Sequence, residues 1–465
     1  MAARVRMLDA AFLALVSALL LTACTGEGAG DRPLECTADV ASIPMLVDLG
    51  WTAPDGATRS WAEYTTADGL THRRDAEAAS GEIAITLFGA GPEEIVEWTG
   101  RSIDEAGTQW SCSGTTTTGA LESGVPTLVV TADNGDWDPD VNYFLGVFYE
   151  MADTVSRAFV VDRTGRYLWY AASDEGTVSV DVHLPRDGRG LLVNQFNRDV
   201  TIDESSIRRL DWDGEEVERT ATPLAHHTFT ELPDGSFAFN QLDPREVLDP
   251  NTGEEELWVG DAIGQVAPGG AATTVFSVWD WLEPVANVYM DGVSLYGGLD
   301  WTHGNLISYD ETTDHYLLSL AHAATIFEID RRGMVPTREL GPPGYPFTDG
   351  STPFTYQHGP VLEDADTLMV FSTPTEQSNS GAFEYALDRP TGALTELWHF
   401  QGNTRAFCLG QAIPLPSTSV LINYGCSATL QEVGRDGAVH WQLDSTAGSG
   451  FGQVIPLATP PWDSE

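Results

Sequence analysis

The sequence predicts an all-β protein, a six-bladed β-propeller preceded by a small β-sandwich. Two observations carry this prediction. Short alternating segments rich in Val, Thr, Tyr, Phe and Trp recur between Gly, Pro and Asp residues, while helix-forming runs are scarce. A strand–turn–strand pattern with a glycine in the turn also recurs six times in the later part of the chain. With 465 residues, the chain is long enough for two or three domains.

The first residues have the features of an export signal. Arg4 and Arg6 form a basic start. The apolar run from Ala10 to Leu21 is too short to cross a membrane as a stable helix. A basic start followed by a short apolar run is typical of a secretory signal peptide, so we expect residues 1–23 to be removed on export.

The end of this signal, LTAC at residues 21–24, resembles the bacterial lipoprotein cleavage box. The resemblance implies that Cys24 becomes the lipidated first residue, with residues 24–35 as a flexible tether. The mature protein would then be held on a membrane, facing the periplasm or at the cell surface. An ordinary cleaved signal with a coincidental cysteine is the alternative.

Export changes how the other cysteines are interpreted. Four remain beside Cys24, namely Cys36, Cys112, Cys408 and Cys426. An even number in an oxidising compartment favours two disulfides. Three pairings are possible, and the local pairing would keep each bridge inside one domain. No CxxC or Cys/His metal spacing is present, so we expect no metal.

Residues 36–122 alternate strand and turn segments and are predicted to form the β-sandwich. Trp51, Tyr64 and the 94–108 stretch weakly resemble a fibronectin-type domain. Another small β domain is the alternative. The boundary is expected near residues 119–126, where small residues and a proline lead into a new strand.

Residues 123–465 contain the repeat that predicts the propeller. Its turn glycines recur at intervals of 45 to 63 residues and are Gly165, Gly214, Gly270, Gly333, Gly392 and Gly437. Four-stranded propeller blades repeat every ~40–50 residues, and loop insertions lengthen some of them. A β-helix would need a much shorter period. The six hairpins therefore predict six blades.

The charge balance excludes one class of partner. The chain has 23 basic and 69 acidic residues, a net charge of −46, and all of its basic residues are arginine. Such a surface repels nucleic-acid backbones and anionic lipid headgroups. We therefore expect no nucleic-acid partner.

Histidines recur in phase with the propeller repeat. When the units are aligned on the turn that follows an early strand, one position carries Ser179, His227, His303, His358 and Gly410. Equivalent positions in successive blades are related by rotation about the propeller axis. If this strand is the inner one, the three imidazoles converge on the central channel, where a site for a small molecule is expected.

Segments around these histidines resemble bacterial arylsulfate sulfotransferases. The similar segments are HHTFTELPDG (226–235), DWTHGNLISYD (300–310), LLSLAHAATIFEID (317–330), YQHGPVLEDADTLMVF (356–371) and GQAIPLPSTSVLINYG (410–425). The resemblance implies a six-bladed propeller that moves a sulfuryl group from an aryl sulfate ester to a phenol, without a nucleotide donor, metal or other cofactor.

The resemblance also implies residue roles. His358 would be the nucleophile that becomes transiently sulfated, and His227, His303 and Asn305 would complete the catalytic set. A neutral imidazole is a good nucleophile, and splitting the transfer in two gives a ping-pong scheme. His227 or His303 would serve as general acid and base, and the Asn305 amide would donate to a sulfuryl oxygen.

One position departs from the family pattern. Where that family has an arginine beside its histidine, this chain has Ala321 followed by His322. Arg405 from the last blade, or a charged His322, would have to bind the sulfate instead, and the alternative is that both are surface or structural groups. Trp301 and Tyr356 are candidates to stack on an aryl substrate or to be core residues.

Two other functions stay open. Because Ala321 cannot hold an anion, the same channel of a non-catalytic propeller could bind a small aromatic or anionic ligand. Alternatively, the acidic propeller could be a cell-surface interaction module. Replacing His358 would leave partner binding unchanged in the last case.

Overall fold

The computed structural model describes residues 31–149, 155–197, 204–248, 253–285, 297–341, 347–374, 378–406, 408–445 and 450–464. The predicted signal and the predicted lipidation site, Cys24, lie outside these residues. The described chain is almost entirely β, with three short 3₁₀ turns, η1 (Val278–Asp280), η2 (Gly425–Ser427) and η3 (Pro461–Ser464). No helix in this part of the chain is both long and apolar enough to cross a bilayer.

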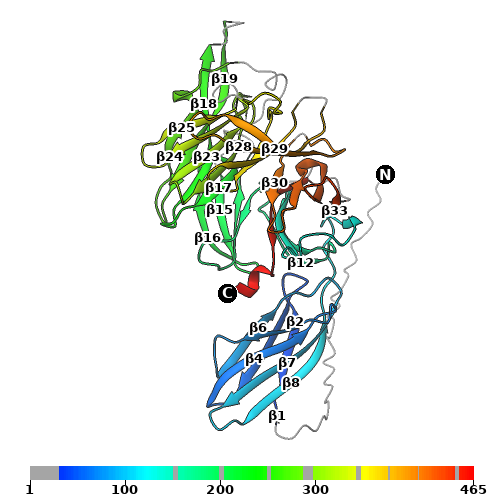
Figure 1. Ribbon diagram of the computed structural model, residues 1–465. Helices are drawn as coiled ribbons and strands as arrows, with labels where there is room; N and C mark the ends of the chain where they lie inside the picture. Colours follow the sequence, from blue (N-terminus) through cyan, green and yellow to red (C-terminus); the bar gives the residue numbers. More distant parts are fainter. Residues whose placement is uncertain are drawn as a thin grey trace, which may run out of the picture.

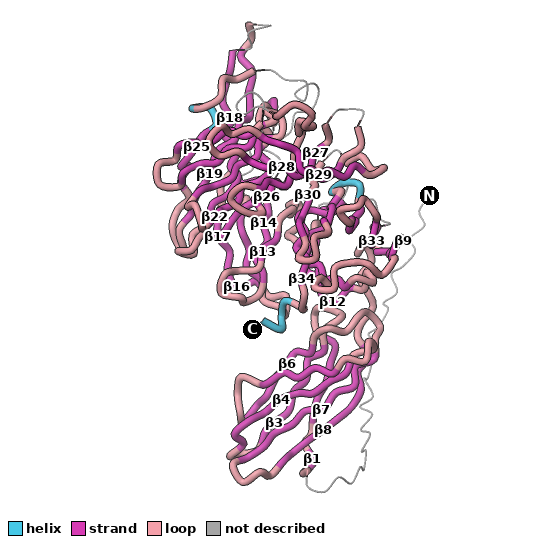
Figure 2. Tube along the Cα trace, in the orientation of Figure 1, coloured by secondary structure: helices cyan, strands magenta, loops and turns pink. Residues whose placement is uncertain are grey.

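The N-terminal strands form a β-sandwich of two sheets (Figure 2). One sheet has the order β1-β8-β7-β4-β5 and the other β2-β3-β6. Their bounds are β1 (Arg32–Pro33), β2 (Cys36–Val40), β3 (Val47–Ala53), β4 (Ala57–Thr65), β5 (Thr71–Asp75), β6 (Gly81–Leu87), β7 (Ile95–Asp104) and β8 (Gln109–Thr117). That the sandwich is of the fibronectin type stays a prediction.

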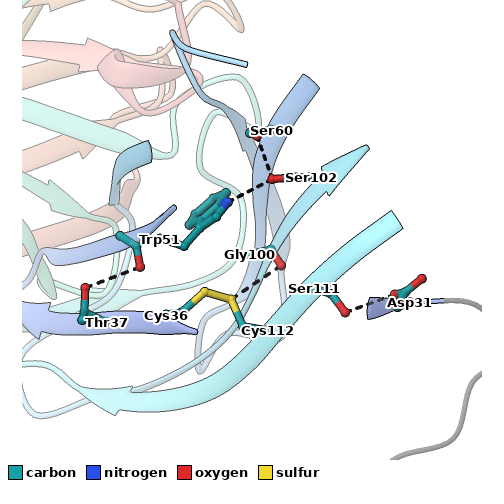
Figure 3. The surroundings of a disulfide bond; sticks show 10 residues. Asp31, Cys36, Thr37, Trp51, Ser60, Gly100, Ser102, Ser111 and Cys112 are labelled. Atoms are coloured by element: carbon teal, nitrogen blue, oxygen red, sulfur yellow. Dashed lines mark hydrogen bonds between the residues drawn. A yellow bond between two sulfur atoms is a disulfide. The ribbon is translucent and has the colours of Figure 1, made fainter. Parts of the chain in front are cut away.

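A disulfide between Cys36 on β2 and Cys112 on β8 joins the two sheets (Figure 3). The Trp51 indole packs beside it and donates to the Ser102 hydroxyl at 3.0 Å. A Cβ at Gly100 would lie 3.1 Å from both the Cys112 sulfur and the Trp51 ring. The absence of a side chain at Gly100 therefore lets the bridge and the indole share the centre of the sandwich core.

The remaining strands form six antiparallel sheets, the blades of a propeller (Figure 1). The first four are β34-β10-β11-β12, β13-β14-β15-β16, β17-β18-β19-β20 and β22-β23-β24-β25. The last two are β26-β27-β28-β29 and β30-β31-β32-β33-β9, and β21 is an extra strand on β19. The predicted all-β fold with six blades is confirmed.

The bounds of the blade strands follow the repeat of the sequence. They are β9 (Leu128–Asp133), β10 (Tyr143–Tyr149), β11 (Arg157–Asp162), β12 (Tyr167–Ala172), β13 (Val182–His183), β14 (Leu191–Gln195), β15 (Ser206–Leu210), β16 (Glu216–Ala221), β17 (Ala225–Glu231), β18 (Phe237–Leu248), β19 (Glu255–Val266), β20 (Thr273–Ser277), β21 (Leu299–Asp300), β22 (Gly304–Asp310), β23 (His315–Leu320), β24 (Thr325–Asp330), β25 (Val335–Leu340), β26 (His358–Leu362), β27 (Thr367–Ser372), β28 (Gly381–Leu387), β29 (Leu394–Gln401), β30 (Gln411–Pro414), β31 (Val420–Asn423), β32 (Thr429–Val433), β33 (Val439–Ser445) and β34 (Gly450–Leu457).

Both ends of the propeller segment close the ring. β34, from the end of the chain, pairs with β10 in the first blade, and β9, from the start of the segment, pairs with β33 in the last blade. A second disulfide, Cys408–Cys426, lies beside the last blade, so both bridges follow the local pairing. The sequence boundary expected at residue 123 falls between β8 and β9.

The sandwich packs against the propeller through a shared apolar cluster and ion pairs. Ile43 and Phe88 of the sandwich share one apolar cluster with Trp212 and Trp462 of the propeller. Arg166, in the turn before β12, adds ion pairs to Glu94 and Asp68 of the sandwich at 2.8 and 3.2 Å. The propeller residues of this contact lie in the turn between β11 and β12, in the turn between β15 and β16 and in η3, whereas the three histidines lie on or beside β17, β22 and β26.

Candidate active site

The three in-phase histidines lie together at the starts of neighbouring inner strands. His227 is on β17, His303 immediately precedes β22, and His358 begins β26. The centroid of the His303 ring is 4.9 Å from that of His227 and 6.3 Å from that of His358. All three side chains are buried. The tertiary structure thus brings the imidazoles of three successive blades into one cluster.

The backbone at these positions is irregular in each blade. The pairing register shifts at the start of β17, β22 and β26. His227 and His303 adopt left-handed φ values of 50° and 51°, whereas in the fifth blade the left-handed residues are Tyr356, at 47°, and Gly359, at 49°. A left-handed non-glycine residue costs about 1–2 kcal/mol and persists only where its surroundings hold it. His358 itself has no left-handed φ and lies between these two residues of the fifth blade.

His303 is paired with a carboxylate. Its Nδ1 lies 2.5 Å from Asp300 Oδ2, and its main-chain N–H donates to Asp300 Oδ1 at 3.1 Å. Burial alone would lower the pKa of His303, but the charge and hydrogen bond of Asp300 raise it above its usual value. Burial would raise the pKa of Asp300, yet His303 holds it below its usual range. Both shifts favour the ion pair of an imidazolium and a carboxylate.

His322 follows Ala321 at the end of β23 and stacks on His303 with a centroid distance of 4.6 Å. Its Nδ1 lies 2.8 Å from the Asp300 carbonyl oxygen, which makes Nδ1 the protonated nitrogen. Burial and the His303 charge lower the pKa of His322 to about 4. The ring is neutral at neutral pH and does not provide the positive charge that an arginine would have supplied.

His358 differs from His303 because no carboxylate contacts it among the described residues. Its Nδ1 lies 3.4 Å from the Tyr356 carbonyl oxygen, and its Nε2 is buried without a hydrogen-bond partner in this part of the chain. Burial, followed by the charge of His303, lowers the pKa of His358 to about 3. With the proton on Nδ1, the lone pair of a neutral imidazole is on Nε2.

His227 is held by its own neighbour in sequence. Its Nδ1 lies 2.8 Å from His226 Nδ1, and His226 Nε2 lies 2.9 Å from Asp261 Oδ1 on β19. The sequence patterns assigned no catalytic role to His226, Asp261 or Asp300. Asp300 lies within the DWTH segment, so its spacing of three from His303 was a signal that could have found it. Asp261 belongs to a different strand and had no such signal.

Asn305 connects two of the histidine strands. Its Nδ2 donates to the Gln357 carbonyl oxygen at 2.6 Å, just before His358. The Gln357 side chain in turn donates to the Leu320 and Thr325 carbonyl oxygens, both at 3.1 Å. One N–H of the Asn305 amide is therefore engaged in positioning the start of β26, and the amide has one further N–H for a substrate oxygen.

The predicted substrate contacts fall into two classes. Tyr356 is half-buried, lies nearly parallel to His322 at 5.7 Å and is 5.4 Å from His358, so it belongs to the site. Trp301 instead packs on Trp279 at 4.8 Å within an apolar core cluster. Arg405 is exposed, and within the described ranges no contact joins its guanidinium to the histidines.

Asp300, His303 and His322 also place possible metal ligands within 4.8 Å of one another. Two ligands about 2.1 Å from one tetrahedral metal are separated by about 3.4 Å. The 2.5 Å between Asp300 and His303 is instead the distance of a charge-assisted hydrogen bond. The Nδ1 atom of His322 is likewise taken by a carbonyl oxygen. The trio as it stands is an ion-pair arrangement.

Part of the chain matches a known protein family. Residues 133–337 match the family model described as arylsulfotransferase (ASST). This part of the propeller is therefore similar to arylsulfotransferases. The matched residues include His227, His303 and His322, whereas His358 lies beyond them. The resemblance seen in the sequence is confirmed, and it supports an arylsulfotransferase-like function in general terms.

Other comparisons add less. No curated protein matches the chain. Among solved structures, a Bacteroides caccae protein of unknown function is 14% identical with a TM-score of 0.45, covering 68% of this chain and 99% of its own. The periplasmic gluconolactonase PpgL of Pseudomonas aeruginosa is 16% identical with a TM-score of 0.40, covering 86% and 99%. A Staphylococcus aureus virginiamycin B lyase is 13% identical with a TM-score of 0.33, covering 61% and 72%.

Proposed function

We propose that the protein transfers a sulfuryl group from an aryl sulfate ester to a phenol through a sulfohistidine at His358. The observation that carries the proposal is the pairing of a neutral nucleophile with a fixed charge. Nε2 of His358 is unprotonated, and the imidazolium of His303 lies on the neighbouring strand. A neutral imidazole attacks well, and a positioned cation stabilises the charge on the transferring group.

In the first half-reaction, His358 Nε2 bonds to sulfur as the bond from sulfur to the aryl oxygen breaks. His227 gives a proton to the leaving oxygen. In the second half-reaction, the phenol oxygen bonds to sulfur, the N–S bond breaks, and the phenol proton passes to His227. His303 stays charged throughout and stabilises the sulfuryl oxygens, together with the remaining Asn305 N–H.

A charge on His303 would also explain how the site can work with Ala321 in place of the family arginine. The charge that the family arginine would bring is supplied here by an imidazolium held by Asp300. Ala321 is fully buried, and its N–H donates to the His303 carbonyl oxygen at 3.0 Å, which fixes the backbone of that residue. The positive charge is then carried by His303, next to the inner strand β22, rather than by a long and flexible arginine side chain.

The proposal is tested with 4-nitrophenyl sulfate as donor and phenol as acceptor. We expect nitrophenol release, phenyl sulfate formation with parallel-line ping-pong kinetics, and an acid-labile mass increase on the peptide that contains residue 358 when phenol is omitted. His399→Asn is the matched control, because His399 is exposed on β29 and lies 2.7 Å from Glu396 rather than beside the histidine cluster. Absence of both nitrophenol and the adduct would exclude the reaction.

A binding role in the same channel is the second candidate. The absence of an arginine at 321 favours it, because a site for a neutral aromatic molecule needs no such cation. Calorimetry with phenol and with phenyl sulfate distinguishes the two. Binding of either without any turnover would favour a ligand-binding propeller.

We further propose that the chain is exported and anchored through a lipid on Cys24. The two disulfides support an oxidising compartment. Radiolabelled palmitate should enter the wild-type protein and not Cys24→Ala. Labelling of the variant at the wild-type level would overturn the anchor.

A further inference from the structure

The inner part of the second blade contains a buried asparagine that the proposed mechanism does not use. Asn194 lies on β14, the second strand of that blade, and is 5% exposed. Its Nδ2 donates to the main-chain carbonyl oxygen of His227 in the third blade. Its Oδ1 accepts from the main-chain N–H groups of Val180 and Asp181, at 3.1 and 3.0 Å. One side chain therefore joins the chain just before β13 to β17 of the next blade.

The orientation of the Asn194 amide is fixed by these partners. A main-chain N–H can only donate and a main-chain carbonyl can only accept. The amide oxygen must therefore face Val180 and Asp181, and the amide nitrogen must face His227. A flipped amide would place donor against donor and acceptor against acceptor. Asn194 is thus a fixed donor to the carbonyl group of His227.

The backbone that follows His227 is held at two further points. The Phe229 N–H donates to Asp181 Oδ2, in the second blade, at 2.9 Å. The Thr228 hydroxyl oxygen accepts from the Ile307 N–H, in the fourth blade, at 2.7 Å. This stretch of the third blade is therefore anchored to the blades on both sides of it.

The left-handed backbone of His227 depends on such anchoring. Its φ is 50°, and a non-glycine residue keeps this conformation only where its surroundings hold it. The bond from Asn194 fixes the plane of the peptide group that follows His227. This plane and φ together set the direction in which the imidazole leaves the backbone, toward a position 4.9 Å from the His303 ring. Loss of the bond would therefore move the His227 ring relative to the rest of the site.

Two other blades carry an asparagine as the fourth residue of the second strand, and only one of them makes the same bond. Asn423 on β31 of the last blade donates through Nδ2 to the Gly452 carbonyl oxygen of the first blade at 2.6 Å. Asn240 on β18 is fully buried, but its amide has no hydrogen-bond partner among the described residues. The bond is therefore not an automatic result of the repeat. It holds a glycine at one junction between blades and a candidate acid–base at the other.

We propose that Asn194 is a positioning residue that holds His227 in place as the acid–base of both half-reactions, an inference that rests on the proposed sulfuryl transfer. Asn194 acts through the backbone of His227 and does not touch the substrate. It sets the path along which a proton passes from His227 to the leaving aryl oxygen, and later from the phenol to His227. The bond between sulfur and His358 does not depend on it.

Asn194→Leu is the principal test, because leucine is similar in size but neither donates nor accepts a hydrogen bond. With 4-nitrophenyl sulfate, whose leaving group needs little protonation, we expect kcat to fall by less than about 10-fold. With phenyl sulfate, whose leaving group needs a proton, we expect kcat to fall by about 100-fold or more, with KM unchanged. Equal losses with the two donors would overturn the positioning role.

Asn423→Leu is the matched control, because it removes the same bond at a junction that carries no histidine. We expect both variants to lower the thermal midpoint, but only Asn194→Leu to make the loss of kcat depend on the leaving group. An equal dependence in Asn423→Leu would show that any such bond acts through the fold as a whole. Should the leucine variant unfold, Asn194→Asp keeps both acceptor contacts, loses only the donor to His227 and must show the same difference between the two aryl sulfates.

The carbonyl group of His227 can be observed directly. Residues 227–228 are the only His-Thr pair in the sequence, so ¹³C in histidine carbonyls and ¹⁵N in threonine give one NMR signal for this peptide group. Loss of a hydrogen bond to a carbonyl oxygen moves its ¹³C signal upfield. We expect this shift in Asn194→Leu and not in Asn423→Leu.

This signal separates failure of the positioning role from failure of the reaction. An unmoved ¹³C signal in Asn194→Leu would overturn the role of Asn194, whether or not aryl sulfates react. A moved signal in a protein whose wild type turns over neither aryl sulfate would instead overturn the sulfuryl transfer, and with it the acid–base role of His227.

Discussion

Two neighbouring imidazoles of the site have nearly the same burial, yet their pKa values are shifted in opposite directions. His303 is 7% exposed and His358 is 4% exposed. The pKa of His303 is raised, with Asp300 at its Nδ1, whereas the pKa of His358 is lowered to about 3, with only a carbonyl oxygen near its Nδ1. The partner of Nδ1, rather than burial, therefore decides the direction in which the pKa of each ring is shifted.

His358→Asn should have the largest effect, because it removes the neutral imidazole that is proposed to form the N–S bond. Asparagine is similar in size but cannot form the N–S bond, so turnover should fall at least about 1,000-fold. Initial rates of nitrophenol release measure this. Retention of more than a tenth of wild-type turnover would assign the nucleophile elsewhere.

Asp300→Asn converts the environment of His303 into one like that of His358. Without the carboxylate, burial is no longer outweighed, so the pKa of His303 should fall below its usual value and the ring should be neutral at pH 7. We expect about a 100-fold loss of kcat at pH 7, partly recovered as the pH is lowered and His303 regains its proton. NMR titration of His303 checks the cause, and an unchanged titration would contradict it.

Ala321→Arg adds a second cation beside His303. Because Ala321 is fully buried and His303 already supplies positive charge, we expect a lower thermal midpoint and less than about a 10-fold gain in kcat/KM. Ala321→Leu serves as the control for added volume. A gain of about 100-fold or more would mean that the imidazolium does not replace the arginine.

The smallest effect concerns stability. The folded pKa of His358, about 3, lies below its usual 6.5, so the unfolded chain binds the extra proton first as the pH falls. Stability is therefore full above about pH 6.5 and declines below it, by up to about 1.4 kcal/mol per pH unit from this residue. Urea unfolding at pH 7, 5 and 4 should show a shallower decline for His358→Asn. Equal declines in the wild type and in His358→Asn would contradict the lowered pKa of His358.

Much of the fold could be predicted from local patterns. The turn glycines repeat because each blade needs the same hairpin, and in-phase histidines converge because the blades share one axis. Trp301 shows the limit of that reasoning. It lies two residues before His303, but in a bend between β21 and β22, where the alternation of a strand does not apply, and its ring packs into the core.

The sequence by itself determined the six blades, the number of cysteines available for bridges and the clustering of His227, His303 and His358. Only the tertiary structure decided that Asp300 raises the pKa of His303 and that Asp261 lies beside His226, which contacts His227. It also showed that the ring of His322 stays neutral. The reason is that proton positions depend on hydrogen bonds between strands and on burial, and neither is encoded in the repeat that places the strands.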